Sequence, residues 1–244
     1  TFTSTMELEK YNKVKEDIIL LSEDVKLYYM NNNELPIYNE KVFDIATYGI
    51  PQKDINPNDS DTYYAIDISL LAKDISLNNG SGNISKDFTS TDLYVVNEQS
   101  LTVYYLQGAV LNGVKHYTII DDFNGGSFAG DYYSNVQLPI ISVITMTSSG
   151  ENENIAKVND VITLKVLSNY EFTQKPTIVI DGEDVSNSCV WNGKVGTVSY
   201  TVKSISDSKA GTKVSLQIYN YTADGRSGDT ITDVNFDKGV YFTN

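Results

Sequence analysis

The chain has 244 residues, 41% hydrophobic and 20% charged, which is ordinary for a folded protein and long enough for two domains. Its 32 acidic and 18 basic residues give a net charge of −14, which argues against binding nucleic acid or an anionic membrane surface, because both require clustered Lys and Arg. The single histidine, His116, and the single cysteine, Cys189, exclude an internal disulfide and any site built on several histidines.

An amphipathic helix is predicted near the start of the chain. Few apolar residues precede Tyr11, so we expect the first turns to be solvated and the later turns to pack on a neighbouring element. Three asparagines at 31–33, followed by Pro36, predict the end of the helix. The apolar residues recur at spacings of three and four, on one helical face, and they form the predicted packing surface: Tyr11, Val14, Ile18, Leu21, Val25 and Tyr28.

Short β-rich segments follow the helix. Residues 37–60 are rich in turn signals, and residues 63–75 suggest a strand that leads into a short helix. Two strands are predicted within 93–106, and Asn112-Gly113 is typical of a tight hairpin turn. We therefore predict that residues 1–137 form an α+β domain in which the long helix packs on a small antiparallel sheet.

Adjacent tyrosines recur in this first region. Neighbouring residues on a strand point to opposite faces, so one member of each pair is expected to face the core and the other to face out. The outward rings would form an amphipathic surface for a partner, or they would simply cover the sheet, and the sequence leaves both interpretations open. The pairs are Tyr63-Tyr64, Tyr104-Tyr105 and Tyr132-Tyr133.

The pattern changes after residue 137. Apolar runs such as "PIISVITMT", "DVITLKVL" and "KVSLQIYNYT" recur about every ten residues and are separated by Gly, Asn and Asp turns. No helical period is present in this half. Short strands at this spacing predict an all-β sandwich over residues 138–244, with the domain boundary near Leu138–Pro139.

The end of the predicted helix, "LYYMNNNELPIY", resembles a segment of the type IV pilin and pseudopilin family. In that family a long helix ends in a similar motif where it docks on a small antiparallel sheet. The family's cleavage site and apolar half-helix are absent here, and we expect that they were removed from the chain. The residues that carry the resemblance are Leu27, Tyr28, Tyr29, Asn32, Pro36 and Tyr38.

The second half resembles the immunoglobulin-like modules of bacterial surface proteins. The matching phrases are "KVNDVITLKV", "KPTIVIDGEDV", "WNGKVGTVSYTV" and "AGTKVSLQIYNYTADGRSGDT". The resemblance implies an immunoglobulin-like β-sandwich, a fold without a common ligand. Trp191 is expected either to fill the core between the sheets or to lie in a loop contact.

Together the two resemblances imply a structural subunit of a type IV pilus or pseudopilus. The added domain suits a minor or tip-located pilin, on the cell surface of a Gram-positive bacterium. Its implied partners are other pilin subunits, through the helix, and a host or surface protein or glycan, through the immunoglobulin-like domain. Only the missing N-terminal segment would enter the membrane, before assembly. The alternative is a cell-surface adhesin or ligand-binding module unrelated to pili, with residues 181–196 and 222–230 as its binding loops.

Little in the sequence points to catalysis, and we expect that the chain is not an enzyme. His116 and Cys189 have no partner group nearby in sequence that would make a general base or an activated nucleophile. A Gly-rich loop carries oxygen ligands of the kind that Ca²⁺ binds, but its spacing is not that of an EF-hand, so a solvated turn is the competing interpretation. The possible calcium ligands are Asp121, Asp122, Asn124 and Asp131, with Asn56–Asp61 as a weaker candidate. No other cofactor is expected.

Overall fold

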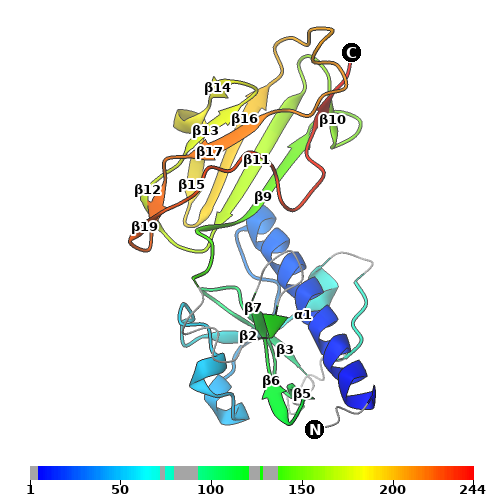
Figure 1. The fold of residues 1–244 in the computed structure, drawn as a ribbon, viewed down its shortest axis with the longest axis vertical. Helices are drawn as coiled ribbons and strands as arrows, with labels where there is room; N and C mark the ends of the chain where they lie inside the picture. Colours follow the sequence, from blue (N-terminus) through cyan, green and yellow to red (C-terminus); the bar gives the residue numbers. More distant parts are fainter. Residues whose placement is uncertain (1–4, 72–74, 80–92, 121–126, 129–136) are drawn as a thin grey trace. The chain divides into compact units, whose positions relative to one another are not determined.

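The chain divides into two compact units, Thr1–Gln137 and Leu138–Asn244. The computed structural model describes residues 5–71, 75–79, 93–120, 127–128 and 137–244 (Figure 1). The first unit is a long helix that contacts antiparallel strands, and the second is built mainly of antiparallel sheets. The predicted fold class, an α+β region followed by an all-β region, is confirmed at this level.

The predicted helix is present as α1, Thr5–Asn32. It ends where the sequence predicted, because Asn33 adopts a left-handed conformation with φ of 55° and donates its N–H to the carbonyl of Tyr29 at 2.8 Å. This single bond satisfies one of the last carbonyls of the helix, and asparagine tolerates the conformation better than most residues.

A four-stranded antiparallel sheet lies beside α1 in the first unit, with the strand order β1-β2-β3-β4 (Figure 1). The strands are β1 (Ile37–Val42), β2 (Tyr63–Ile66), β3 (Tyr94–Asn97) and β4 (Val103–Tyr105). β1 falls in the turn-rich segment 37–60 and was not predicted from the sequence. The register between β1 and β2 shifts along the pair. The sequence of β1 alternates only weakly between apolar and polar residues, as expected for a strand with irregular pairing.

The predicted hairpin at Asn112-Gly113 is confirmed. It joins β5 (Ala109–Leu111) to β6 (Val114–His116), and both turn residues have positive φ angles, 52° and 78°. Such angles match the twist of the flanking strands, which is why Asn-Gly is favoured here. The remaining elements of the first unit are the pair β7 (Ile119–Ile120) and β8 (Ser127–Phe128), and short 3-10 turns at Ile45–Tyr48, Gln52–Asp54 and Ile68–Leu70.

Two sheets form the body of the second unit, with the orders β15-β16-β11-β9 and β14-β13-β17. A parallel pair, β10-β20, and a small sheet, β12-β18-β19, complete it (Figure 1). The longer strands are β9 (Ile141–Ser148), β11 (Val161–Ser168), β13 (Thr177–Ile180), β16 (Val195–Thr201) and β17 (Leu216–Tyr219). The shorter strands are β10 (Ile155–Ala156), β12 (Phe172–Gln174), β14 (Glu183–Asp184), β15 (Val190–Asn192), β18 (Thr222–Ala223), β19 (Arg226–Ser227) and β20 (Tyr241–Phe242).

One core cluster holds the second unit together, and it takes side chains from both sheets. On β11, Ile162 and Leu164 are buried while Thr163 between them is partly exposed, as expected for a strand with one face on the core. Ile178 of β13 and Ile218 of β17 contribute from the other sheet. The two sheets therefore pack face to face, as in a β-sandwich.

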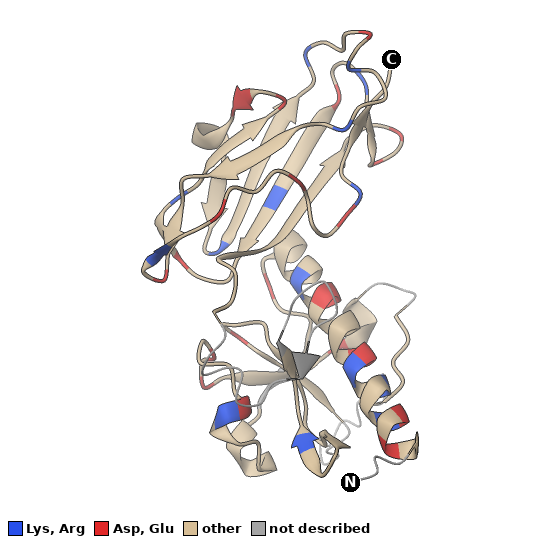
Figure 2. Cartoon of the chain, in the orientation of Figure 1, with Lys and Arg blue, Asp and Glu red and all other residues tan. Residues whose placement is uncertain are grey.

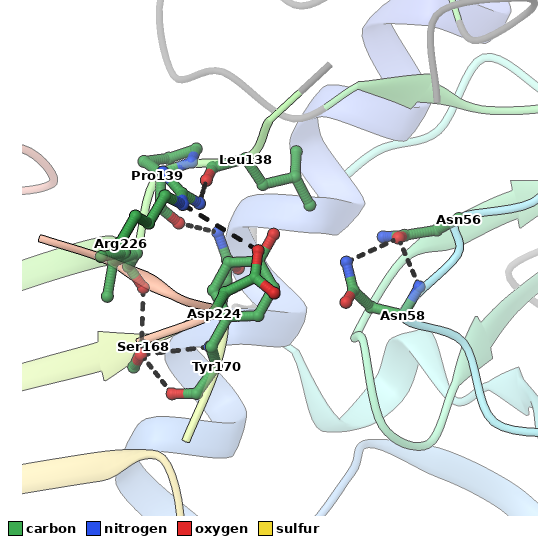
Figure 3. A network of polar contacts seen from close by, with 10 residues as sticks. Asn56, Asn58, Leu138, Pro139, Ser168, Tyr170, Asp224 and Arg226 are labelled. Atoms are coloured by element: carbon green, nitrogen blue, oxygen red, sulfur yellow. Dashed lines mark hydrogen bonds and ion pairs between the residues drawn. The ribbon is translucent and has the colours of Figure 1, made fainter. Parts of the chain in front are cut away.

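Polar contacts fix the first residues of the second unit (Figure 3). The guanidinium of Arg226 donates to the carbonyl of Leu138 and lies over the ring of Tyr170, 5.4 Å from its centroid. The hydroxyl of Ser168 donates to the carbonyl of Ile140 at 3.0 Å. These bonds join the segment that precedes β9 to β11 and β19 within the same unit.

Candidate functional site

The helix face that packs on the sheet is the candidate site of the first unit. Val14, Ile18, Leu21 and Val25 are each 0% exposed, and α1 contacts β4, β5 and β7. Full burial of an apolar side chain of this size stabilises a protein by roughly 1.5–3 kcal/mol. These four residues thus form a continuous apolar contact between the helix and the strands.

The two tyrosines of the predicted packing surface lie at its ends and are only partly buried. Tyr11 meets His116 of β6 edge to face, with 5.7 Å between the ring centroids, and burial raises the pKa of the Tyr11 hydroxyl. Tyr28 donates its hydroxyl to the carboxylate of Glu34 at 3.2 Å. The predicted surface therefore has a dry centre and polar ends.

The tyrosine pair on β4 corrects one sequence expectation. Tyr104 and Tyr105 point to opposite faces, yet both are buried, because this sheet is covered on both sides. Tyr105 stacks on Tyr94, with 4.7 Å between the ring centroids, and Tyr104 meets Tyr63 edge to face at 5.8 Å in a separate core cluster. Neither ring is available as an outward binding surface. The pair Tyr132-Tyr133 lies outside the described residues.

A buried carboxylate links α1 to the sheet. Asp17 is 1% exposed and accepts the hydroxyl of Tyr94 at 2.7 Å and the backbone N–H groups of Asn78 and Asn79 at 2.7 Å each. These bonds satisfy a charge that would otherwise be costly to bury. Asp17 was not predicted as a site residue, although its position three residues after Val14 places it on the apolar face of the helix.

Two further polar residues on α1, Ser22 and Lys26, are buried. Burial lowers the pKa of the Lys26 ammonium to about 7, and the neighbouring Glu23 opposes this shift. Lysine shifts its pKa readily when it leaves water. The buried face of α1 is therefore apolar along its centre and carries titratable groups at Asp17 and Lys26.

A small hollow lies where the first turns of α1 approach the β5–β6 hairpin. It has a volume of about 400 Å³, and its lining includes Met6, Lys10, Val110 and Lys115. Met6 is 81% exposed, and Leu8, Val110 and Val114 are also exposed. The exposed N-terminal end of the helix thus adjoins an apolar surface.

The segment Asn56–Asp61, the weaker calcium candidate, is held by hydrogen bonds within the protein. Asp59 accepts the hydroxyls of Tyr63 at 2.7 Å and Tyr104 at 2.6 Å, and also that of Ser100. Burial raises the pKa of the Asp59 carboxyl to about 6, despite these bonds. The oxygen of the Asn56 side chain accepts the backbone and side-chain N–H groups of Asn58 (Figure 3).

The main calcium candidates, Asp121, Asp122, Asn124 and Asp131, lie outside the described residues. Within the described part of the chain, no group of three or more His, Cys, Asp and Glu side chains is placed to hold a metal ion. The same part has no helix with the length and apolarity needed to cross a membrane.

An aromatic cluster in the second unit includes one residue of the predicted binding loops, Trp191 of segment 181–196. Trp191 of β15 meets Phe172 edge to face at 5.0 Å, and Phe172 meets Tyr221 at 6.0 Å. The ring of Trp191 occupies the space above Gly196, where a Cβ would lie 2.7 Å from the indole. Cys189 is partly buried next to this cluster, and burial raises the pKa of its thiol to about 11, so the thiolate is disfavoured.

Comparisons of the chain with protein-family models, with curated proteins and with solved structures give no match.

Proposed function

We propose that the chain is the folded part of a type IV pilin-like subunit, with α1 as its assembly element. The observation that carries this proposal is the docking of α1, in which Val14, Ile18, Leu21 and Val25 are fully buried against antiparallel strands. This leaves the first turns of α1, around Met6 and Leu8, exposed at one end. In the proposal these turns continue into an apolar segment that anchors the subunit and then packs against neighbouring subunits.

The charge pattern of α1 supports a helix that meets both solvent and neighbours. Acidic and basic residues both occur on its exposed side, including the ion pair of Glu9 with Lys13 at 2.7 Å (Figure 2). A mixed pattern of this kind lets copies of one helix approach each other without strong repulsion. In this proposal the second unit is an appended domain of a minor or tip subunit, where few neighbours have to accommodate it.

Thiol labelling on the producing bacterium tests the proposal. In a Cys189→Ser background, single cysteines replace Met6 or Asp207, both exposed. We expect a maleimide to label both positions in the purified chain, but only position 207 in the surface fraction, where assembly covers the start of α1. Equal labelling of both positions at the cell surface would contradict the pilin-like role and would favour a surface adhesin unrelated to pili.

A further inference from the structure

The outer edge of β9 is covered in an unusual way. Residues 233–239, here named the C-terminal strap, run along this edge without forming a regular strand. The side-chain amide of Asn235 accepts the N–H of Ile144 through Oδ1 at 2.8 Å and donates through Nδ2 to the carbonyl of Ser142 at 2.8 Å. A side chain thus supplies the bonds that a neighbouring strand would normally make.

The carboxylate of Asp237 continues this pattern. It accepts the N–H of Met146 at 2.9 Å and the N–H of Gly239 at 2.9 Å. Among the described residues, a single backbone-to-backbone bond joins the strap to β9, from the N–H of Asn235 to the carbonyl of Ile144 at 3.2 Å. Two side chains therefore carry most of the hydrogen bonding that covers this edge.

Without the strap, β9 would be an exposed edge of eight residues. Its sequence, "ISVITMTS", is rich in β-branched residues and carries no charged side chain, as its uniform colour in Figure 2 shows. An uncovered strand of this kind is a template for pairing with another chain. In a chain with a net charge of −14, an uncharged edge is also a place where two copies can approach with little repulsion.

The edge is complementary to itself. The residues whose backbone groups point outward, Ser142, Ile144 and Met146, are evenly spaced about Ile144. If two copies pair antiparallel about this residue, Ile144 faces Ile144 and Ser142 faces Met146. Each outward N–H then meets a carbonyl, as a two-fold symmetric contact requires.

We propose that the outer edge of β9 is a latent self-association surface, which the C-terminal strap covers through Asn235 and Asp237 and which a second copy of this chain pairs with when the strap is released. This inference is independent of the function proposed above.

Sedimentation of the full chain tests this proposal. The double variant Asn235→Ala, Asp237→Ala removes the strap's side-chain bonds to β9. The control Asp233→Ala lies in the same strap but removes bonds that do not reach β9, the ion pair with Lys213 and the bond from the N–H of Val234. We expect the double variant to dimerise about tenfold or more tightly than the control. Its dimer should protect the Ile144 and Met146 amides from hydrogen exchange. A double variant that remains as monomeric as the control, or a dimer in which these amides exchange freely, overturns the proposal.

Hydrogen exchange of the unmodified chain gives a second test that does not depend on the variant folding. We expect the amides of Ile144 and Met146, bonded to the strap, to exchange faster than those of Thr145 and Thr147, which face β11 by strand alternation. Exchange of all four only through global unfolding would mean that the strap does not release, and would overturn the proposal.

Discussion

At the scale of single residues, polar groups buried inside the first unit are the least predictable feature of this protein. Asp17 and Asp59 both lie among tyrosines, and each carboxylate accepts at least one phenolic hydroxyl. Tyrosine suits this role because its ring fills apolar space while its hydroxyl remains a donor. The high tyrosine content therefore serves partly to satisfy buried charge.

Asp59 makes the stability of the first unit depend on pH. The pKa of Asp59 in the folded state is about 6, above the ordinary value of 3.8, so protonation of this carboxyl stabilises the folded state. The stabilisation is fully present below pH 3.8 and is lost as the pH rises through 6. We expect the free energy of unfolding of the unmodified chain to rise when the pH falls from 7.5 to 4.5. In the Asp59→Asn variant this rise should be smaller by about 1–3 kcal/mol. Urea titrations followed by near-UV circular dichroism of the tyrosines measure this difference.

The exposed neighbour Asp61 supplies the matched control. Asp61→Asn should retain the pH dependence of the unmodified chain. Trp191, the single tryptophan, lies in the second unit, and its fluorescence should be unaffected by either change. Parallel pH profiles for Asp59→Asn and the unmodified chain would be inconsistent with a desolvated carboxyl at this position.

At the scale of elements, the docking of α1 is the contact on which the first unit depends. The helix has a dry apolar centre, a buried polar link at Asp17 and partly exposed tyrosines at either end. Apolar burial supplies most of the free energy of such a contact. The hydrogen bonds of Asp17 fix where along its length the helix meets the sheet.

Leu21 measures the strength of this contact, because its side chain is fully buried. We expect Leu21→Ala to reduce the free energy of unfolding by about 2–5 kcal/mol, through lost burial and the cavity that remains. The exposed Asn12 on the same helix gives the comparison, and Asn12→Ala should change stability by less than about 0.5 kcal/mol. Urea unfolding of both variants measures these changes. Equal losses of unfolding free energy would mean that the buried apolar residues of α1 do not hold the helix on the strands.

At the scale of the whole molecule, each compact unit has its own buried core. The core cluster of the second unit contains residues of Leu138–Asn244 alone. The polar contacts around Leu138 join the start of this unit to other residues of the same unit. A core of this kind is what an independently folding domain requires.

We therefore expect residues 138–244, produced alone, to unfold in one cooperative urea transition of Trp191 fluorescence. Ile178→Asp, which places a charge in the middle of the core, should abolish that transition. A gradual, non-cooperative change in the unaltered fragment would contradict an independent second domain.

The sequence by itself determined the local structure, because local signals act over a few residues. The spacing from Val14 to Val25 specified α1, residues 31–36 specified its end, and Asn112-Gly113 specified the hairpin. Strong alternation or continuous apolarity likewise marked the long strands of both units. The irregular strand β1 and the two-residue strands were not foreseen, because their pairing depends on neighbours distant in the chain.

Only the tertiary structure decided how residues far apart in sequence combine. It buried Tyr104 and Tyr105 together, since the sheet is covered on both faces, and it brought Asp17 to Tyr94. It also laid Asn235 and Asp237 along the edge of β9, about ninety residues away in sequence, where nothing in either segment predicts the contact. The physical reason is that helix periods and turns are local, whereas burial and the satisfaction of buried charge are properties of the assembled fold.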